Sequence, residues 1–204
     1  MVDIKQQQIA CPSWGFDIDR VERFAFWEDA FDPEECDAIV KYGKSFQLRK
    51  AAILNSDNDS KETDGYRKSE IVFLAPADDI TWCYKRLTDI ILELNNSFFG
   101  FDIFGLTENL QFTEYNAPAG HYDSHIDKVY GGQIRKLSFV LQLSDPSEYE
   151  GGELRIINSN EHDIMKKKKG TLSIFPSYTL HQVTPVTKGT RHSLVGWVSG
   201  KPFR

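Results

Sequence analysis

The spacing of apolar residues predicts helices in the first half of the chain. Asp32 has the properties of a helix N-cap, and Pro33 follows at the first helical position, where proline is tolerated. Apolar residues then recur at helical spacing, at Cys36, Ile39 and Val40. Gly43 suits the C-terminal cap, so this pattern predicts a short amphipathic helix from Pro33 to about Gly43.

A second helix is predicted after Asp78 and Asp79, ending near Asn95. Its buried side is expected to carry an aromatic and aliphatic stripe formed by Trp82, Leu87, Ile90, Ile91 and Leu94. Stripes of this kind are typical of a core-facing helix, and we interpret both helices as structural support.

The pattern changes to strands from about Leu110. Short runs rich in branched and aromatic residues are separated by Gly, Pro, Asp or Asn, at residues 110–115, 121–127, 137–143, 153–157, 171–175, 181–186 and 191–198. Strands at such near-regular spacing are typical of a double-sheet jelly roll. We therefore predict one mainly β domain over residues 1–204, in which residues 1–104 support a β core formed by residues 105–204.

Composition and charge narrow the class of partner. The 204 residues are 40% hydrophobic and 26% charged, as in ordinary globular proteins. The formal net charge is −6, which argues against a nucleic-acid partner, because phosphate backbones are usually bound by a basic surface. The one basic run, Lys166 to Lys169, is interpreted as a solvated hairpin tip.

The cysteines and the amino terminus suggest a location. Cys11, Cys36 and Cys83 are widely spaced and form no Cys-x-x-Cys pair, which fits a reducing compartment and provides no thiolate metal site. The first residues lack the features of a secretory signal, and no run approaches the roughly 18 apolar residues of a membrane span. We expect a soluble cytoplasmic protein without a membrane partner.

Candidate metal ligands occur in the predicted strand at 121–127. His125 and Asp127 stand two apart, so on a strand they share one face. A second imidazole, from His181, would complete a 2-His-1-carboxylate triad, which holds Fe(II) on one side and leaves positions open. A second pair, His121 and Asp123, is in phase with the first, and spacing alone does not choose between the two.

Arg191 follows His181 by ten residues. If the chain turns at residues 187–190, Arg191 lies on the next strand and could hold the far carboxylate of a dicarboxylate bound to iron. The residues thus suggest an oxygenase.

Three segments resemble the prolyl 4-hydroxylase-type branch of the 2-oxoglutarate- and Fe(II)-dependent dioxygenases. The run from Tyr115 to Asp127 is similar to the signature Tyr-x4-Gly-x-Tyr-x2-His-x-Asp, and residues 181–197 resemble the block with the distal histidine and the arginine. Residues 143–154 are similar to the linking segment of bacterial and phage members. The resemblance covers about residues 105–200 and points to His125 and Asp127 as the ligand pair.

This resemblance implies a fold, cofactors and residue roles. The fold would be a cupin-like double-stranded β-helix, with Fe(II) bound by His125, Asp127 and His181. The co-substrate would be 2-oxoglutarate, converted with O2 to succinate, with ascorbate in a supporting role. Arg191 and Ser193 would hold its 5-carboxylate. Further contacts to the co-substrate or the pocket wall would come from Tyr115, Gln142, Tyr122 and Trp197.

The resemblance also suggests a substrate, a prolyl residue in a peptide or protein. Arg191 stands where the animal collagen enzymes are expected to have Lys, which places the chain nearer the oxygen-sensing, bacterial and phage branch. The short single-domain form suggests a microbial or viral source. A hydroxylase of a free amino acid or other small metabolite is an alternative, and it would need an enclosed pocket with a second charged clamp. An AlkB-like nucleic-acid demethylase is disfavoured by the net charge. A non-catalytic jelly-roll module is disfavoured because the three ligands and Arg191 are all present.

The polar segment 55–65 has two interpretations. It is either a surface loop or a lid over the substrate, since long loops often have such functions. The residues that follow, Tyr66 to Ser69, are expected to begin a strand that flanks the mouth of the site.

Overall fold

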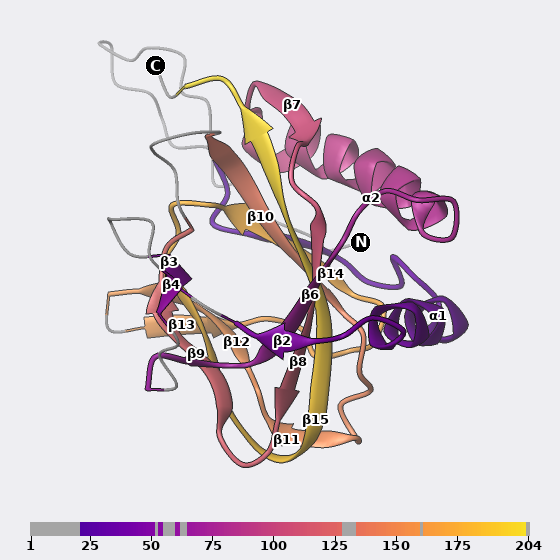
Figure 1. Ribbon diagram of the computed structural model, residues 1–204. Helices are drawn as coiled ribbons and strands as arrows, with labels where there is room; N and C mark the ends of the chain where they lie inside the picture. The colour runs from indigo at the N-terminus through magenta and orange to yellow at the C-terminus, as the bar shows by residue number, and fades with distance from the viewer. Residues whose placement is uncertain are drawn as a thin grey trace, which may run out of the picture.

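A computed structural model describes residues 21–51, 53–54, 60–61, 65–127, 134–159 and 161–202. Two helices, α1 (Pro33–Lys44) and α2 (Thr81–Leu94), accompany a set of antiparallel strands (Figure 1). The strands are β1 (Ala25–Trp27), β2 (Arg49–Lys50), β3 (Ile53–Leu54), β4 (Ser60–Lys61), β5 (Arg67–Lys68), β6 (Glu70–Leu74), β7 (Ile103–Leu106), β8 (Leu110–Asn116), β9 (Gly120–His125), β10 (Arg135–Gln142), β11 (Tyr149–Gly151), β12 (Leu154–Asn158), β13 (Glu161–Ile164), β14 (Leu172–Pro176) and β15 (His181–Gly200).

The strands form two faces of a jelly roll. The large sheet has the order β1-β14-β10-β15-β8-β6-β2, and β7 pairs with the end of β15. The small sheet contains β5, β9, β11, β12 and β13, joined to the first half of β15. The jelly roll predicted from the strand spacing is therefore confirmed.

Strand β15 connects the two sheets. Its first residues pair with β9 and β12, whereas Thr190 to Val195 pair with β8, and the ribbon curves back between these halves (Figure 1). Two separate strands with a turn at 187–190 were expected, but the ladder is continuous. The reason is that β8 and β9 bend beside it: Ala117 and Ala119 donate to the carbonyls of Gly189 and Val186 at 3.1 and 2.9 Å.

Two apolar clusters follow from this arrangement. The first lies between the sheets and contains Tyr115, Val140, Tyr149, Leu154, Ile156, Met165, Phe175, Val183 and Val186. The second joins the outer face of the large sheet to both helices, which lie beside that sheet in Figure 1. The helices thus back the sheet, as their apolar stripes predicted, and leave the space between the sheets for chemistry.

Helix α1 begins as its sequence predicts. The Asp32 side chain accepts from the Glu35 amide at 2.8 Å, and Glu35 accepts from the Asp32 amide at 3.0 Å, which is a capping box. The predicted C-cap at Gly43 is wrong, because the helix continues to Lys44 and Ser45 is the cap. Gly43 instead lies against Phe112, whose ring would be 2.6 Å from an added Cβ.

Helix α2 buries Cys83, Leu87, Ile90, Ile91 and Leu94, so most of the predicted stripe is confirmed. Trp82 is only partly buried and packs at the edge of this cluster. The helix ends in a π-helical turn (Asn95–Phe99), which Gly100 terminates with φ of 66°.

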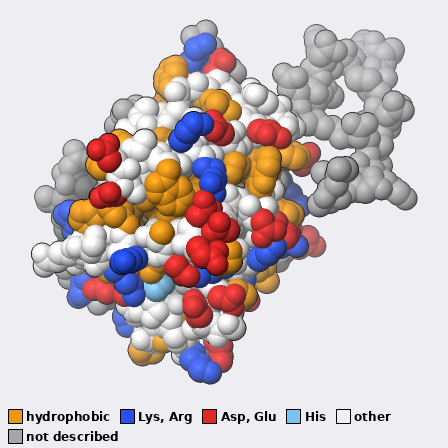
Figure 2. All heavy atoms as spheres, turned by 90° about the vertical axis from the view of Figure 1, so that its right-hand side faces the viewer, with side chains coloured by type: hydrophobic (Ala, Val, Ile, Leu, Met, Phe, Trp, Pro, Cys, Tyr) orange, Lys and Arg blue, Asp and Glu red, His pale blue; other side chains and the backbone are white. Residues whose placement is uncertain are grey.

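The face that carries the helices has acidic and basic side chains interspersed (Figure 2). The basic run at 166–169 takes part in this pairing, since Lys168 and Lys169 lie 2.7 and 2.6 Å from Asp29 and Asp37. The run is therefore paired with acidic residues near helix α1 and is not a fully solvated tip. Within the described residues, no helix is long and apolar enough to cross a membrane.

The loop interpreted as a surface loop or lid falls mostly outside the described residues. Strand β3, just before this segment, pairs with β4, in its middle, as a small two-stranded sheet. The strand expected after it is present as β5, which pairs with β9.

Candidate metal centre

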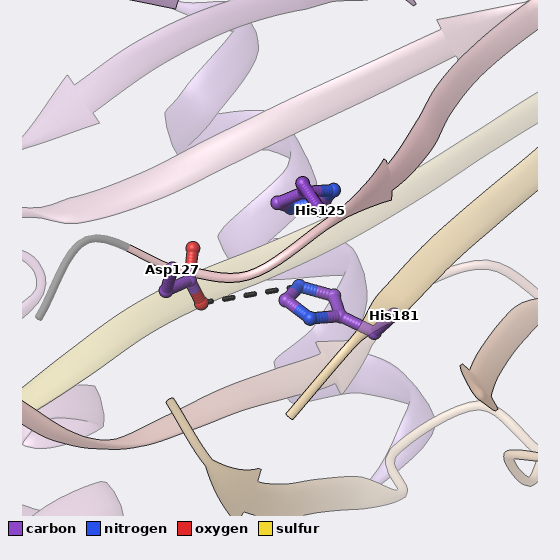
Figure 3. A group of neighbouring side chains, drawn as sticks. All are labelled: His125, Asp127 and His181. Carbon is purple, nitrogen blue, oxygen red and sulfur yellow. Dashed lines mark ion pairs between the residues drawn. The ribbon is translucent and has the colours of Figure 1, made fainter. Parts of the chain in front are cut away.

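His125, Asp127 and His181 lie together where the end of β9 pairs with the start of β15. Strand pairing places His181 opposite His125, and one ligand atom from each of the three residues lies within 4.8 Å of the others. Oδ2 of Asp127 is 3.9 Å from Nε2 of His181 (Figure 3). Two imidazoles and one carboxylate at this separation form a donor set that suits Fe(II).

Backbone carbonyls orient both imidazoles. Nδ1 of His125 lies 2.7 Å from the carbonyl oxygen of Asp123, and Nδ1 of His181 lies 2.9 Å from that of Thr179. A hydrogen bond from each Nδ1–H fixes the tautomer and leaves Nε2 unprotonated for a metal. Nδ1 of His121 makes the same contact to Ala119, at 2.8 Å, but this residue is not in the cluster. The structure thus brings together the His125 pair and leaves the His121 pair outside it.

Asp127 lies just after the strand, not on it as expected, because β9 ends at His125. The Asp127 amide donates to the carbonyl of Ser177 at 3.0 Å, and its Oδ2 accepts from the Ser138 hydroxyl. The Ser138 hydroxyl also lies 2.9 Å from that of Ser177. These contacts from β10 and the end of β14 hold the carboxylate toward the histidines.

Sequence reasoning missed Arg135, which lies behind Asp127. Its Nη1 is 3.8 Å from Oδ1 of Asp127, and it is also paired with Glu108. Its guanidinium stacks 3.8 Å above the Trp197 ring. No local pattern distinguishes this arginine from others at the start of a strand, so only the folded arrangement identifies it.

The electrostatics favour the forms that bind metal. Burial and the neighbouring His181 lower the pKa of His125 to about 4, so its imidazole is neutral at pH 7. Burial would raise the pKa of Asp127, but His181 and the Ser138 hydrogen bond outweigh it and hold the pKa below its usual value. The centre therefore presents a neutral imidazole at His125 and an ionised carboxylate at Asp127.

A second group of polar residues lies deeper between the sheets, around Arg191. This residue is 2% exposed, and its guanidinium lies 5.5 Å from the ring centre of Tyr115, its neighbour across the β8–β15 ladder. Nη1 of Arg191 and Oγ of Ser193 are buried and have no hydrogen-bond partner among the described residues. Buried polar groups in folded proteins usually have hydrogen-bond partners. Two donors without such partners on one strand face therefore suit an anionic ligand.

The walls of this pocket combine apolar and polar side chains. They come from Val140, Gln142, Tyr149, Gly152, Leu154, Met165, Lys166, Lys167, Ser173 and Arg191. Nε2 of Gln142 donates to the hydroxyl of Tyr149 at 2.9 Å. Burial raises the pKa of Tyr149, and Arg191, which hydrogen-bonds to it, opposes that rise. Tyr149 is a pocket residue that sequence reasoning missed.

Gly152 leaves room for Arg191. Its φ is +59°, and an added Cβ would lie 3.0 Å from Cδ of Arg191 and 2.9 Å from Val186. The absence of a side chain at Gly152 therefore gives the arginine its space.

The two weaker pocket candidates have different positions. Tyr122 stacks on the His125 ring, with centroids 3.5 Å apart and planes at 19°. Trp197 is buried beside Ser138 and Arg135, and its Nε1 has no partner among the described residues. Both therefore lie near the metal centre, and neither lines the Arg191 pocket.

The sequence profile of the 2OG-Fe(II) oxygenase superfamily matches residues 110–199. A PKHD-type hydroxylase of Prochlorococcus marinus (strain NATL2A) is 38% identical over 144 residues, which is 69% of this chain and 65% of that protein. A second PKHD-type hydroxylase, from strain NATL1A, is 36% identical over 149 residues, 71% of this chain and 66% of that protein. The matches thus span slightly less than two thirds of these relatives' lengths.

Solved structures of prolyl hydroxylases share the fold. A prolyl-4-hydroxylase of Pseudomonas putida superposes with a TM-score of 0.70 at 19% identity, covering 88% of this chain and 94% of that one. A Trichoplax adhaerens prolyl hydroxylase, in complex with a peptide fragment of a hypoxia-inducible-factor degradation domain, has a TM-score of 0.72 at 16% identity, covering 87% and 84%. A viral collagen prolyl hydroxylase of Paramecium bursaria Chlorella virus-1, in complex with 2OG, has a TM-score of 0.67 at 20% identity, covering 89% and 97%.

Proposed function

Because the chain belongs to the 2OG-Fe(II) oxygenase superfamily, we propose that it uses Fe(II), 2-oxoglutarate and O2 to hydroxylate a prolyl residue in a peptide or protein. The observation that carries this proposal is the combination of a His-Asp-His cluster with a buried arginine whose Nη1 has no partner among the described residues. Residues 105–202 would form the catalytic core, with the preceding helices as support.

The metal ligands would be Nε2 of His125 and His181 and the carboxylate of Asp127. Their Nδ1 contacts to backbone carbonyls hold the rings in place, and Ser138 holds the carboxylate. These three side chains supply a single negative charge to a divalent cation, so an anionic co-substrate is electrostatically favoured.

Arg191 would bind the 5-carboxylate of 2-oxoglutarate through charge-assisted hydrogen bonds, with Ser193 donating a further one. Tyr115 would pack beside this carboxylate, and Gln142 would position the hydroxyl of Tyr149 at the same end of the pocket. With both partners bound, the iron and its co-substrate supply oxidative decarboxylation coupled to hydroxylation of an unactivated C–H bond. The chain's own residues orient the reactants and exclude water.

The substrate class rests on the relatives. Two of the structural neighbours are described as a prolyl-4-hydroxylase and as a prolyl hydroxylase bound to a peptide fragment. At below 25% identity they establish the fold, and they suggest an extended proline-containing segment across the mouth of the barrel. The free thiols Cys36 and Cys83, both buried, fit a protein of a reducing compartment such as the cytoplasm.

The test is succinate formation from 2-oxoglutarate with Fe(II), O2 and ascorbate as reductant, with and without a panel of proline-containing peptides. We expect peptide-stimulated turnover and a gain of about 16 Da on proline, the mass of one oxygen atom. Turnover that no peptide stimulates would contradict the peptidyl-proline substrate while retaining the oxygenase. A chain that forms no succinate and binds neither iron nor 2-oxoglutarate would contradict the oxygenase itself.

A further inference from the structure

A further arginine, Arg67, lies close to His125 of the metal centre. Strand β5 places it opposite Tyr122 of β9, and its guanidinium lies 4.5 Å above the Tyr122 ring centre. The other contact of that ring is His125, stacked at 3.5 Å. Arg67 is therefore separated from a metal ligand by one aromatic ring.

Arg67 is 8% exposed, yet it forms no ion pair with any carboxylate of the described residues. Its Nε donates to the Ser69 hydroxyl at 3.0 Å, and the described residues provide no acceptor for its terminal nitrogens. Three other arginines are each paired with a glutamate, Arg86 with Glu35, Arg135 with Glu108 and Arg155 with Glu153. A buried cation without an acid is unfavourable unless something else compensates it.

A cavity of about 160 Å³ opens beside this guanidinium. It is lined by Lys50, Ala51, Arg67, Lys68, Ser69, Glu70 and Asn116. The one carboxylate in this lining, Glu70, accepts from the Asn116 amide at 3.5 Å, and Lys68 donates to the carbonyl of Pro118 at 3.0 Å. The cavity thus combines a net positive lining with a guanidinium that has no acidic partner among the described residues.

We propose that Arg67 binds a carboxylate of the substrate and so selects substrates that are acidic close to the hydroxylated carbon. This subsite rests on the proposed oxygenase function and deepens it. The planar fork of a guanidinium matches a carboxylate in two parallel hydrogen bonds, which Ser69 and Tyr122 pre-orient by fixing the arginine. The carboxylate has two sources, an acidic side chain next to a peptide proline or the α-carboxylate of a free amino acid or chain end.

The experiment uses two matched pairs of probes. The peptides acetyl-Gly-Ala-Pro-Glu-Gly-amide and acetyl-Gly-Ala-Pro-Gln-Gly-amide test the side-chain source, and L-proline and L-prolinamide test the α-carboxylate. Affinity is measured by calorimetry on the protein loaded with Fe(II) and 2-oxoglutarate without oxygen, and turnover is then measured in air. Both measurements compare the wild type with Arg67→Gln and with the control variant Arg49→Gln. The control removes an exposed arginine from the neighbouring strand β2.

In at least one pair, we expect the wild type and Arg49→Gln to bind the carboxylate probe on the order of tenfold or more tightly than its amide. Arg67→Gln is expected to bind both members alike, while Arg67→Lys recovers part of the preference through its charge. The pair that shows the preference identifies the source of the carboxylate. A wild type without preference in either pair, or a preference that survives Arg67→Gln, would overturn the subsite.

The two proposals fail separately. If the carboxylate and amide probes are hydroxylated equally well, the oxygenase function is supported and the Arg67 subsite is contradicted. If the protein prefers the carboxylate probe through Arg67 but forms no succinate in air, the subsite is supported and the oxygenase function is contradicted.

Discussion

Local geometry does not by itself select the metal-binding histidines. Nδ1 of His121, His125 and His181 each contacts the backbone carbonyl two residues earlier in the chain. Only His125 and His181 also face Asp127, because the β9–β15 ladder places them opposite each other. The distinction between the two His-x-Asp pairs is thus a property of the strand pairing.

Replacing Asp127 and Asp123 separately tests this assignment. Asp127→Ala is expected to abolish iron-dependent turnover and to weaken Fe(II) binding measured by calorimetry, because it removes the only carboxylate of the cluster. Asp123→Ala is the control, since Asp123 contacts His125 through its backbone carbonyl, which the substitution retains. Loss of iron binding in Asp123→Ala with retention in Asp127→Ala would reverse the assignment.

Arg191 has a corresponding test for the co-substrate. Arg191→Ala is expected to weaken 2-oxoglutarate binding on the order of ten- to a hundredfold, because charge-assisted hydrogen bonds in a buried pocket are lost. The measurement is 2-oxoglutarate affinity by calorimetry on the iron-loaded protein, with Arg155→Ala as the control. If Arg191→Ala binds 2-oxoglutarate as tightly as the wild type and has the same circular dichroism spectrum, Arg191 does not bind the 5-carboxylate as proposed.

Among the elements, helix α1 is fitted closely to the large sheet. The absence of a side chain at Gly43 lets the helix approach strand β8, whose Phe112 is fully buried. A glycine that looked like a helix end in the sequence therefore serves close packing between two elements, which local patterns do not reveal.

Gly43→Ala tests this packing. Alanine usually stabilises a helix by about 1 kcal/mol over glycine, but here the added Cβ would meet the Phe112 ring at 2.6 Å. Overpacking of this kind costs about 1–3 kcal/mol, so after the helix gain we expect a net loss of stability of up to about 2 kcal/mol in urea unfolding. Gly65→Ala is the control, because nothing lies within 4 Å of its Cβ position. A gain in stability for Gly43→Ala would show that the ring shifts at little cost.

Glu114 joins three elements. It lies on β8, accepts from His192 of β15 at 2.9 Å and from Asn116 at 2.8 Å, and pairs with Lys44 of α1 at 3.2 Å. The hydrogen bond from His192 is the main reason why its pKa falls to about 2 from an ordinary 4.5, against the opposing effect of burial. His192 thus points away from the Arg191 pocket, as strand alternation predicts.

The lowered pKa of Glu114 predicts an acid dependence of stability. Its contribution is complete above pH 4.5 and is lost as the pH falls toward about 2, where the folded state also becomes protonated. Glu114→Gln is therefore expected to lower the free energy of unfolding by about 1–2 kcal/mol at pH 7, allowing for partial solvent screening. Urea unfolding from pH 7 to pH 2 measures this, and the difference from wild type should vanish near pH 2. An equal loss in the exposed control Glu93→Gln, or a difference that does not vary with pH, would contradict it.

On the scale of the whole molecule, the fold and the metal site are separable. The apolar cluster between the sheets and the cluster under the helices are formed without the ligand residues. The jelly roll should therefore persist without iron, in contrast to small domains whose folding depends on a metal.

Metal removal tests this separation. The protein treated with a chelator is expected to keep its circular dichroism spectrum. Fe(II), added without oxygen at about 100 times its dissociation constant, should raise Tm by about 5–10 °C. Asp127→Ala, whose metal ligand is lost, should show no such rise. If the protein unfolds when the metal is chelated, the metal has a structural role. If it still binds a partner after chelation, that result would favour a non-catalytic module.

The sequence predicted most of the site because its chemistry is carried by residue types at fixed spacings. Donor chemistry and strand alternation indicated the kinds of ligand, and the family resemblance pointed to His125 and Asp127 rather than to the pair at His121. Both helices follow from apolar periodicity and the Asp32 cap. Arg135, Tyr149 and Arg67 did not emerge, because their significance depends on what lies across the sheets from them. The assignment of site roles to all these residues remains a prediction for the experiments above.

By itself, the sequence determined the mainly β jelly roll and the kinds of ligand available to a metal, since strand alternation and side-chain chemistry are local. The tertiary structure alone decided three other features: which His-x-Asp pair meets His181, how one continuous strand carries His181 and Arg191 on two sheets, and which arginine lies against the Tyr122 ring beside His125. These depend on ladder register and long-range packing. A shift of one residue in a strand would turn each side chain to the opposite face, so such features arise only when the sheets assemble.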